Sequence, residues 1–182
     1  MIENWIETIK RENIKSKRNV LVFSKSDFKK VADKVLQEIP DQVAFISIEG
    51  TPDCIKYWLE SEKGDFDNDH YLSPGPHTLN LEFDDLTEDQ EYKGHLFKTI
   101  TQEQADQIVE FVEKNLDRNI IIHCKAGKSR SQAVARFILD FYSDSFTMCE
   151  ENRNNPCISP NIEVISKLKK AIWRKGGNSL YM

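Results

Sequence analysis

The segment from 119 to 142 constrains the fold more than any other part of the chain. It begins with an apolar run, NIIIHC, continues through a short basic loop, KAGKS, and ends in a helix-like stretch, RSQAVARFILDFY. A short run of branched apolar residues is typical of a strand buried on both faces, as in a parallel sheet. We therefore predict a strand over 119–123 and a helix over 130–142, joined by a loop at the carboxyl end of the strand.

Strand-like and helix-like segments alternate along the rest of the chain. Strands are predicted over 19–23, 43–48 and 78–83, and helices over 26–39, 52–61 and 161–173 and from about residue 101. This alternation favours an α/β fold with a central, mainly parallel twisted sheet flanked by helices. Residues 1–17 carry apolar side chains at helical spacing, which predicts an amphipathic N-terminal helix packed on the body.

Length and composition limit the classes of protein to consider. A chain of 182 residues that is 39% hydrophobic suits one globular domain over 1–182. The net charge of -5 argues against sequence-independent binding to nucleic acid. No apolar stretch is long enough to span a membrane and the acidic N-terminus does not resemble a secretory signal, so we expect a cytoplasmic protein. Nothing in the sequence specifies an oligomeric state.

The loop over 124–130 is predicted to bind an oxyanion. In an open parallel sheet, ligands collect beyond the carboxyl ends of the strands. Backbone amides of the loop and the N-terminus of the next helix attract anions, and Gly127 permits the backbone angles that such a loop needs. Arg130 can bind two oxygens of a tetrahedral anion. Because a thiol in this positive field ionises readily, the natural substrate is a phosphate monoester attacked by Cys124.

The nonapeptide HCKAGKSRS resembles the signature of the cysteine-dependent protein tyrosine phosphatase superfamily, particularly its small dual-specificity branch. The resemblance covers most of residues 43–172, which would be the recognisable catalytic core, and includes VAFISIEG, LNLEFDD and ISPN. It implies a tyrosine phosphatase-like fold and a phosphocysteine intermediate. It also implies that Cys124 is the nucleophile and Arg130 the phosphate clamp. The phosphate-binding loop would consist of Lys125, Ala126, Gly127, Lys128, Ser129 and Arg130.

The same resemblance implies roles for three residues around the loop. Ser131 would hydrogen-bond the thiolate and help it to leave the phosphoenzyme. His123 would brace the loop and tune the thiol through hydrogen bonds, with a satisfied core histidine as the alternative. Asn161 would support the loop or the attacking water. Neither a metal nor a cofactor is implied, because the loop and Arg130 perform the electrostatic work on the phosphoryl group. The cysteines also lack the CxxC spacing of a zinc site.

Expulsion of the leaving oxygen requires a general acid. A cluster of acidic residues follows the strand over 78–83, within a stretch, 84–94, that we expect to be a solvated loop. The resemblance of LNLEFDD to the strand and acid loop of the family places the general acid at Asp85, with Asp84 as the alternative. Three histidines, His70, His77 and His95, lack metal-ligand spacing and are expected at the surface.

Lys125 and Lys128 affect which substrate is expected. Their extra positive charge in the loop favours a more anionic substrate. The KAGK pattern also resembles the loop of the phosphoinositide 3-phosphatase branch, but Ser129 and Ser131 replace the Gly and Thr usually found there. The sequence therefore favours a protein phosphatase acting on phosphotyrosine and also on phosphoserine or phosphothreonine, with phosphoinositides or RNA 5′-triphosphates as alternative substrates. A phosphate-binding scaffold is a further alternative, but it predicts loss of the nucleophile, clamp or acid.

Overall fold

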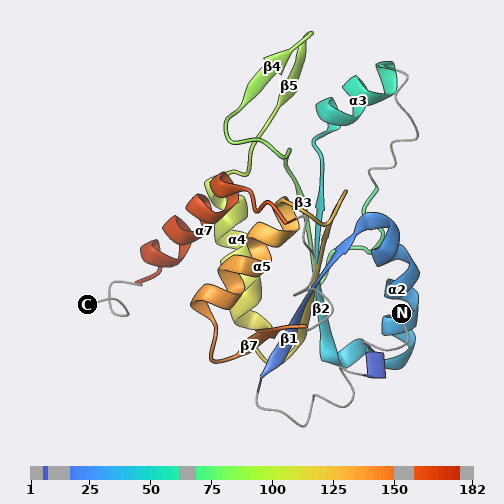
Figure 1. The fold of residues 1–182 in the computed structure, drawn as a ribbon, viewed down its shortest axis with the longest axis vertical. Coiled ribbons are helices and arrows are strands. Elements are labelled where there is room, and N and C mark those ends of the chain that lie inside the picture. Colours follow the sequence, from blue (N-terminus) through green and yellow to red (C-terminus); the bar gives the residue numbers. More distant parts are fainter. Residues whose placement is uncertain (1–5, 8–16, 62–68, 150–157, 177–182) are drawn as a thin grey trace.

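The computed structural model describes residues 6–7, 17–61, 69–149 and 158–176. A five-stranded sheet with the order β3-β2-β6-β1-β7 runs through its centre (Figure 1). The strands are β1 (Arg18–Ser24), β2 (Val43–Glu49), β3 (Thr78–Glu82), β6 (Asn119–Cys124) and β7 (Phe146–Met148). Every pairing within this sheet is parallel. The predicted α/β fold with a central, mainly parallel sheet is therefore confirmed.

Strand β6 occupies the middle of the sheet, between β1 and β2. All six of its residues are buried. A strand with neighbours on both edges and helices on both faces needs apolar side chains throughout, which explains why NIIIHC shows no alternation. The register pairs Cys124 with Ser24 of β1 and His123 with Ser47 of β2. The strand predicted over 119–123 is confirmed, and it delivers Cys124 to the carboxyl edge of the sheet.

Helices cover both faces of the sheet (Figure 1). On one face lie α4 (Gln102–Lys114), α5 (Arg130–Phe141) and α7 (Ile162–Arg174), and on the other lies α2 (Lys25–Glu38). Ile6, in a short described helical piece, is buried against α2, but most of the helix predicted over 1–17 lies outside the described residues. Within the described part of the chain, no helix combines the length and apolar character needed to cross a membrane.

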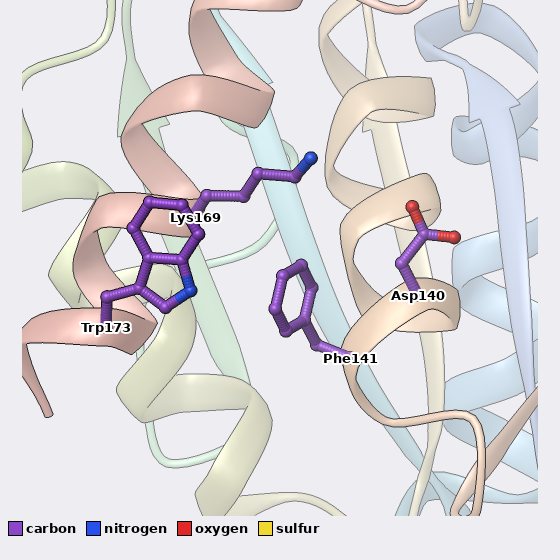
Figure 2. A pocket seen from close by; sticks show the side chains of 4 residues that line it. All are labelled: Asp140, Phe141, Lys169 and Trp173. Carbon is purple, nitrogen blue, oxygen red and sulfur yellow. The ribbon is translucent and has the colours of Figure 1, made fainter. Parts of the chain in front are cut away.

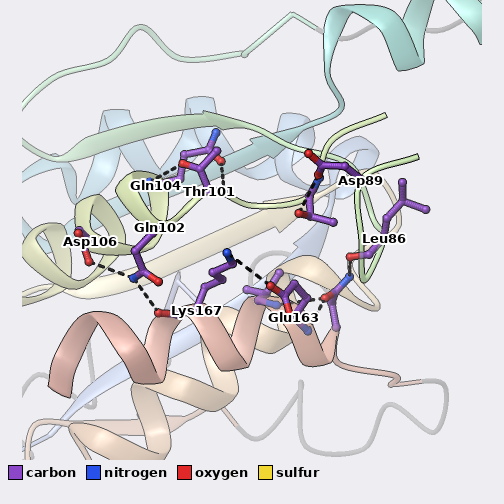
Figure 3. A network of polar contacts seen from close by, with 11 residues as sticks. Leu86, Asp89, Thr101, Gln102, Gln104, Asp106, Glu163 and Lys167 are labelled. Carbon is purple, nitrogen blue, oxygen red and sulfur yellow. Dashed lines mark hydrogen bonds and ion pairs between the residues drawn. The ribbon is translucent and has the colours of Figure 1, made fainter. Parts of the chain in front are cut away.

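Side chains just before the helices satisfy their first amides. Thr101 and Gln104 form a reciprocal capping box at α4 (Figure 3). Asn161 caps α7 by accepting hydrogen bonds from two amides of its first turn. Ser129, which precedes α5, is an exception because its hydroxyl does not bond to the helix. The amides at the start of α5 therefore face the loop that follows Cys124 without a side-chain cap.

Two elements project beyond the carboxyl end of the sheet (Figure 1). One is α3 (Pro52–Glu60), which the sequence predicts, and the other is an antiparallel hairpin of β4 (Gln90–Tyr92) and β5 (His95–Phe97). The sequence instead predicts a solvated loop over 84–94, which is wrong for this hairpin. Lys93 and Gly94 form its turn with positive φ angles of 52° and 77°, and such angles are typical of two-residue hairpin turns.

Candidate active site

Cys124 and Ser131 lie together at the carboxyl edge of the sheet. Cys124 ends β6, and Ser131 lies in the first turn of α5, so the loop between them brings the two side chains close together. Both are buried, and Cys124 Sγ lies 3.1 Å from Ser131 Oγ. A serine hydroxyl can donate to a thiolate as well as accept from a thiol. The arrangement therefore suits a sulfur atom that changes its ionisation or bonding state.

Gly127 allows the loop to fold back onto β1. Its φ of 68° is in the left-handed region, and a Cβ at this position would lie 2.7 Å from backbone atoms of Phe23 and Ser24. Only glycine satisfies both conditions without a shift of the backbone. The Gly127 carbonyl also accepts a hydrogen bond of 3.1 Å from the side chain of Gln132, which is buried in α5. The loop is thus fixed from two sides.

Arg130 is a buried cation that has no counterion among the described residues. It is only 7% exposed, and its Nη1 donates to the carbonyls of Glu49 at 2.9 Å and Phe83 at 2.7 Å. Its buried Nε has no hydrogen-bond partner among the described residues, and no described carboxylate forms an ion pair with it. Because a buried guanidinium is costly without a partner, this geometry predicts that an anion binds beside Arg130.

Asp84 is the first residue of the acid loop, which we define as residues 84–89 between β3 and β4. It is 4% exposed and accepts hydrogen bonds from the amide and hydroxyl of Thr51 and from the amide of Lys98. These bonds, of 2.7–2.9 Å, tie the start of α3 to the chain that leaves the hairpin. Asp84 is therefore engaged in hydrogen bonds that hold the fold together. These bonds do not favour Asp84 as a general acid.

Asp85 is exposed and reaches over the loop that follows Cys124. Its Oδ1 accepts hydrogen bonds from Ser129 Oγ at 2.7 Å and from Asn161 Nδ2 at 2.8 Å. Among the described residues, no hydrogen bond reaches Oδ2. The carboxyl group is consequently oriented through one oxygen while the other is available to a ligand. This environment suits proton transfer better than that of Asp84 does.

A pocket of about 280 Å³ lies beside Arg130 and Asp85. We call it the Arg130 pocket; Glu49, Gly50, Cys54, Trp58, Asp84, Leu86, Phe97 and Lys125 complete its lining. Trp58 of α3 and Phe97 of β5 give it aromatic walls. These two elements pack together because the ring of Tyr57 makes edge contacts with Tyr92 and Phe97 of the hairpin. The lining of the pocket therefore combines basic and acidic side chains with aromatic surface.

Lys125 and Lys128 differ in their relation to this pocket. Both side chains are exposed, as is that of Ala126. Lys125 lines the Arg130 pocket, whereas Lys128 is absent from the described lining. The backbone carbonyl of Lys128 accepts a hydrogen bond from the amide of Ser159, just before α7. Of the two lysines, Lys125 is thus the better placed to meet an anion.

His123 lies beneath the loop, in the core between the sheet and α2. Its ring stacks on Phe28, with centroids 4.1 Å apart, and neither ring nitrogen has a hydrogen-bond partner among the described residues. The predicted hydrogen bonds that would tune the thiol are therefore not observed there, and the alternative of a satisfied core histidine does not apply either. Burial, helped by the charge of Lys25, lowers the pKa of His123 to about 3.

Cys54 is the thiol in the described lining of the Arg130 pocket. It is half-buried in α3, and burial together with the negative charge of Asp84 raises its pKa to about 12. The raised pKa disfavours the thiolate form of Cys54 at neutral pH. The sequence alone gives Cys54 no feature that separates it from a small apolar residue of the core. Its contact with Asp84 depends on how the acid loop folds.

The histidines expected at the surface make specific contacts instead. His95 is buried, and its Nε2 lies 3.0 Å from Glu60 Oε2, which joins the hairpin to α3. His70 and His77 are partly buried and bond to Ser47 and Asn115. The surface prediction is wrong for His95 because the hairpin that carries it was not foreseen.

A buried ion pair next to the loop also escaped prediction. Lys25 Nζ lies 3.0 Å from Glu49 Oε1 and donates to the carbonyl of Asp69 at 2.9 Å, while its backbone amide donates to the Lys125 carbonyl at 3.2 Å. Lys25 thus links β1, β2 and the chain before β3 to the loop. The available signal is that Lys25 closely follows the apolar run of β1 and that Glu49 ends the apolar run of β2.

Comparison with known proteins gives matches in structure alone. No family model and no curated protein matches the sequence. The crystal structure of the human tyrosine phosphatase-like serine/threonine/tyrosine-interacting protein aligns with a TM-score of 0.49 and 17% identity, covering 86% of this chain and 93% of the other. The crystal structure of PTPMT1 aligns with a TM-score of 0.46 and 19% identity, covering 88% and 96%.

Proposed function

We propose that this protein is a cysteine-dependent phosphatase that hydrolyses phosphotyrosine, and also phosphoserine or phosphothreonine, in polypeptides. The observation that carries the proposal is Arg130, a buried guanidinium without a described counterion, beside a loop that begins at Cys124. A phosphoryl group supplies the missing negative charge and brings phosphorus to the sulfur atom. The proposed domain comprises residues 1–182.

The first step transfers the phosphoryl group to the enzyme. The Cys124 thiolate attacks phosphorus, and the bond between phosphorus and the ester oxygen breaks as the bond to sulfur forms. Asp85 donates a proton to the departing oxygen, which leaves as an alcohol or phenol. Arg130 and the loop amides bind the three phosphoryl oxygens, which carry most of the charge.

The second step regenerates the enzyme. Asp85, now a carboxylate, takes a proton from a water molecule that attacks phosphorus, and the bond between phosphorus and sulfur breaks to release inorganic phosphate. The Ser131 hydroxyl, 3.1 Å from the sulfur, donates to the departing thiolate and stabilises it. Asn161 and Ser129 keep the Asp85 carboxyl in position through both steps.

The walls of the Arg130 pocket support a protein substrate. Trp58 and Phe97 offer apolar and aromatic surface, against which the ring of a phosphotyrosine packs well. An inositol ring carries hydroxyl groups that these walls would leave without hydrogen bonds. Lys125 is the observation that favours a more anionic substrate, so phosphoinositides remain the second candidate.

The decisive test compares hydrolysis by the purified wild type and by a Cys124→Ser variant in the presence of EDTA. We expect the wild type to hydrolyse para-nitrophenyl phosphate and the variant to show only the background rate. With phenyl phosphate, whose leaving group is poorer, Asp85→Asn should lower kcat by about 10²-fold or more, because the general acid is lost.

Asp84→Asn is the matched control for the general acid. Since Asp84 accepts three hydrogen bonds within the fold, we expect its substitution to lower the melting temperature while its kcat falls less than that of Asp85→Asn. The opposite order of the two rates would assign the acid to Asp84. Equal and negligible rates in the wild type and Cys124→Ser would indicate a phosphate-binding scaffold instead of an enzyme.

A further inference from the structure

We infer that a second cavity next to the Arg130 pocket binds a side chain that flanks the phosphorylated residue of a polypeptide substrate. This inference rests on the proposed function and defines its substrate more closely. The cavity has a volume of about 400 Å³ and lies between the acid loop, the start of α7 and Ser129. We call it the flanking pocket.

The flanking pocket adjoins the Arg130 pocket, because Asp85 and Leu86 line both cavities. Side chains on the same side of an extended peptide are about 7 Å apart. A peptide that places its phosphoryl group beside Arg130 and Asp85 therefore carries a neighbouring side chain to the flanking pocket. Para-nitrophenyl phosphate is too small to occupy both.

The lining of the flanking pocket suits an apolar side chain attached to a peptide backbone. Ile162, the first residue of α7, is 70% exposed, and with Pro160 and Leu86 it supplies apolar surface. Gln90 and Ser159 supply polar groups that can bond to backbone amides and carbonyls. An exposed isoleucine is ordinary by itself, but this one lines a cavity that adjoins the candidate active site.

The charge of the flanking pocket argues against a polyphosphorylated ligand. The described residues that line it include no lysine or arginine, and Asp85 contributes a carboxyl group. A second phosphate would lie beside that carboxyl without the cationic donors that phosphate binding normally requires. An acidic residue next to the phosphorylated one would be repelled for the same reason, so the pocket favours apolar over acidic neighbours.

Hydrogen bonds hold the walls of the flanking pocket in place. Asn161 Nδ2 donates to the Leu86 carbonyl at 3.1 Å as well as to Asp85, while Asn161 Oδ1 accepts from the amides of Glu163 and Val164. One side chain therefore joins the acid loop to α7. A cavity with fixed walls loses little entropy when it binds a ligand, which makes this one suitable for sequence discrimination.

The test measures the affinity of labelled phosphotyrosine peptides for the Cys124→Ser protein by fluorescence anisotropy. Each peptide carries Leu, Ala or Glu at one position, from two residues before to two residues after the phosphotyrosine. We expect one position at which Leu binds about tenfold more tightly than Glu, because a partly buried leucine contributes about that factor. Two further substitutions in the Cys124→Ser background should each reduce the preference for Leu over Glu to about twofold. Ile162→Ser removes apolar surface from the flanking pocket, and Ser159→Trp fills the pocket.

Trp173→Ser is the matched control. Trp173 is another exposed apolar residue of α7, but it lines a separate cavity with Asp140, Phe141 and Lys169 (Figure 2). This substitution should leave the preference intact in the Cys124→Ser background, and in the wild type it should leave kcat/KM for para-nitrophenyl phosphate within about twofold.

Three results would overturn the inference. They are the absence of a preferred position, a preference that survives both pocket substitutions, and tighter binding of a soluble phosphoinositide than of every peptide. Hydrolysis of para-nitrophenyl phosphate by the wild type tests the proposed phosphatase activity independently of the flanking pocket. Activity without a flanking preference would therefore refute the flanking pocket alone.

Discussion

The floor and the rim of the candidate active site are built by different means. The floor, residues 124–131, is fixed by backbone geometry and buried polar contacts, including the positive φ of Gly127 and the bond from Gln132. The rim consists of α3 and the β4–β5 hairpin, which meet through aromatic side chains such as Tyr57 and the exposed Tyr92. The floor therefore tolerates little change, whereas the rim can vary in shape without disturbing the chemistry below it.

The largest effect is expected when a methyl group is added to the floor. Gly127→Ala would place a Cβ 2.7 Å from the β1 backbone, so the loop must move, and a displacement of about 1 Å lowers kcat by about 10²-fold. Gly94→Ala is the matched control in the rim, since Gly94 also has a positive φ but has no atom within 4 Å of the added Cβ. Steady-state kinetics with para-nitrophenyl phosphate should show that Gly94→Ala changes kcat by less than about twofold. A similar fall of kcat in Gly127→Ala and Gly94→Ala would contradict the distinction between floor and rim.

An intermediate effect, on stability, is expected from the histidine beneath the floor. The pKa of His123 is about 3 in the folded protein, against about 6.5 in an unfolded chain. As the pH falls, the unfolded state binds the proton first, so stability is nearly complete at pH 7 and declines as the pH drops from about 6.5 toward 3. The His123 contribution lost between pH 7 and pH 5 is about 2 kcal/mol, or about 30-fold in the unfolding equilibrium.

Urea unfolding at the two pH values measures this loss. His123→Phe keeps an aromatic ring against Phe28 but cannot bind a proton, so its free energy of unfolding should fall by about 2 kcal/mol less than that of the wild type. If the wild type and the variant lost the same amount, His123 would not be the source of the acid sensitivity.

The smallest effect is expected in the rim. Trp58→Ala removes an aromatic wall of the Arg130 pocket and should raise KM for an aryl phosphate about tenfold, with kcat changed by less than about twofold. Leu59→Ala, at the next position on α3, removes an exposed side chain that is not among the described lining. Leu59→Ala should leave KM and kcat unchanged. A large fall of kcat in Trp58→Ala would show instead that the rim takes part in the chemistry.

The sequence predicts the fold and the floor because their signals are local. The strand–loop–helix pattern around Cys124 and Arg130 lies within 24 consecutive residues, from 119 to 142, and it places both side chains without knowledge of the remaining fold. The predicted strand and helix agree with β6 and α5. The placement of the general acid at Asp85 instead of Asp84 rests on a family resemblance and stays a prediction. Asp84 accepts hydrogen bonds within the fold, whereas Asp85 accepts one from Ser129 in the loop.

The rim and the buried ion pair depend on contacts that no local pattern encodes. The hairpin strands have three residues each, too few for an alternating pattern to be distinguished from a polar loop. Lys25 meets Glu49 because the start of α2, which directly follows β1, and the end of β2 lie at the same edge of the parallel sheet. The sequence alone does not show this arrangement of the strands. The contact of His95 with Glu60 depends on the hairpin, which brings β5 beside α3.

Ser129 has a consequence for the stability of the whole protein. Its hydroxyl donates to Asp85 instead of capping α5, so an anion in the loop would serve as the cap of a helix that packs in the core. Ligand occupancy and folding then become linked quantities. Each tenfold rise in phosphate concentration above its dissociation constant would add about 1.4 kcal/mol to the free energy of unfolding. The substrate would thus complete the N-terminus of a core helix each time it binds.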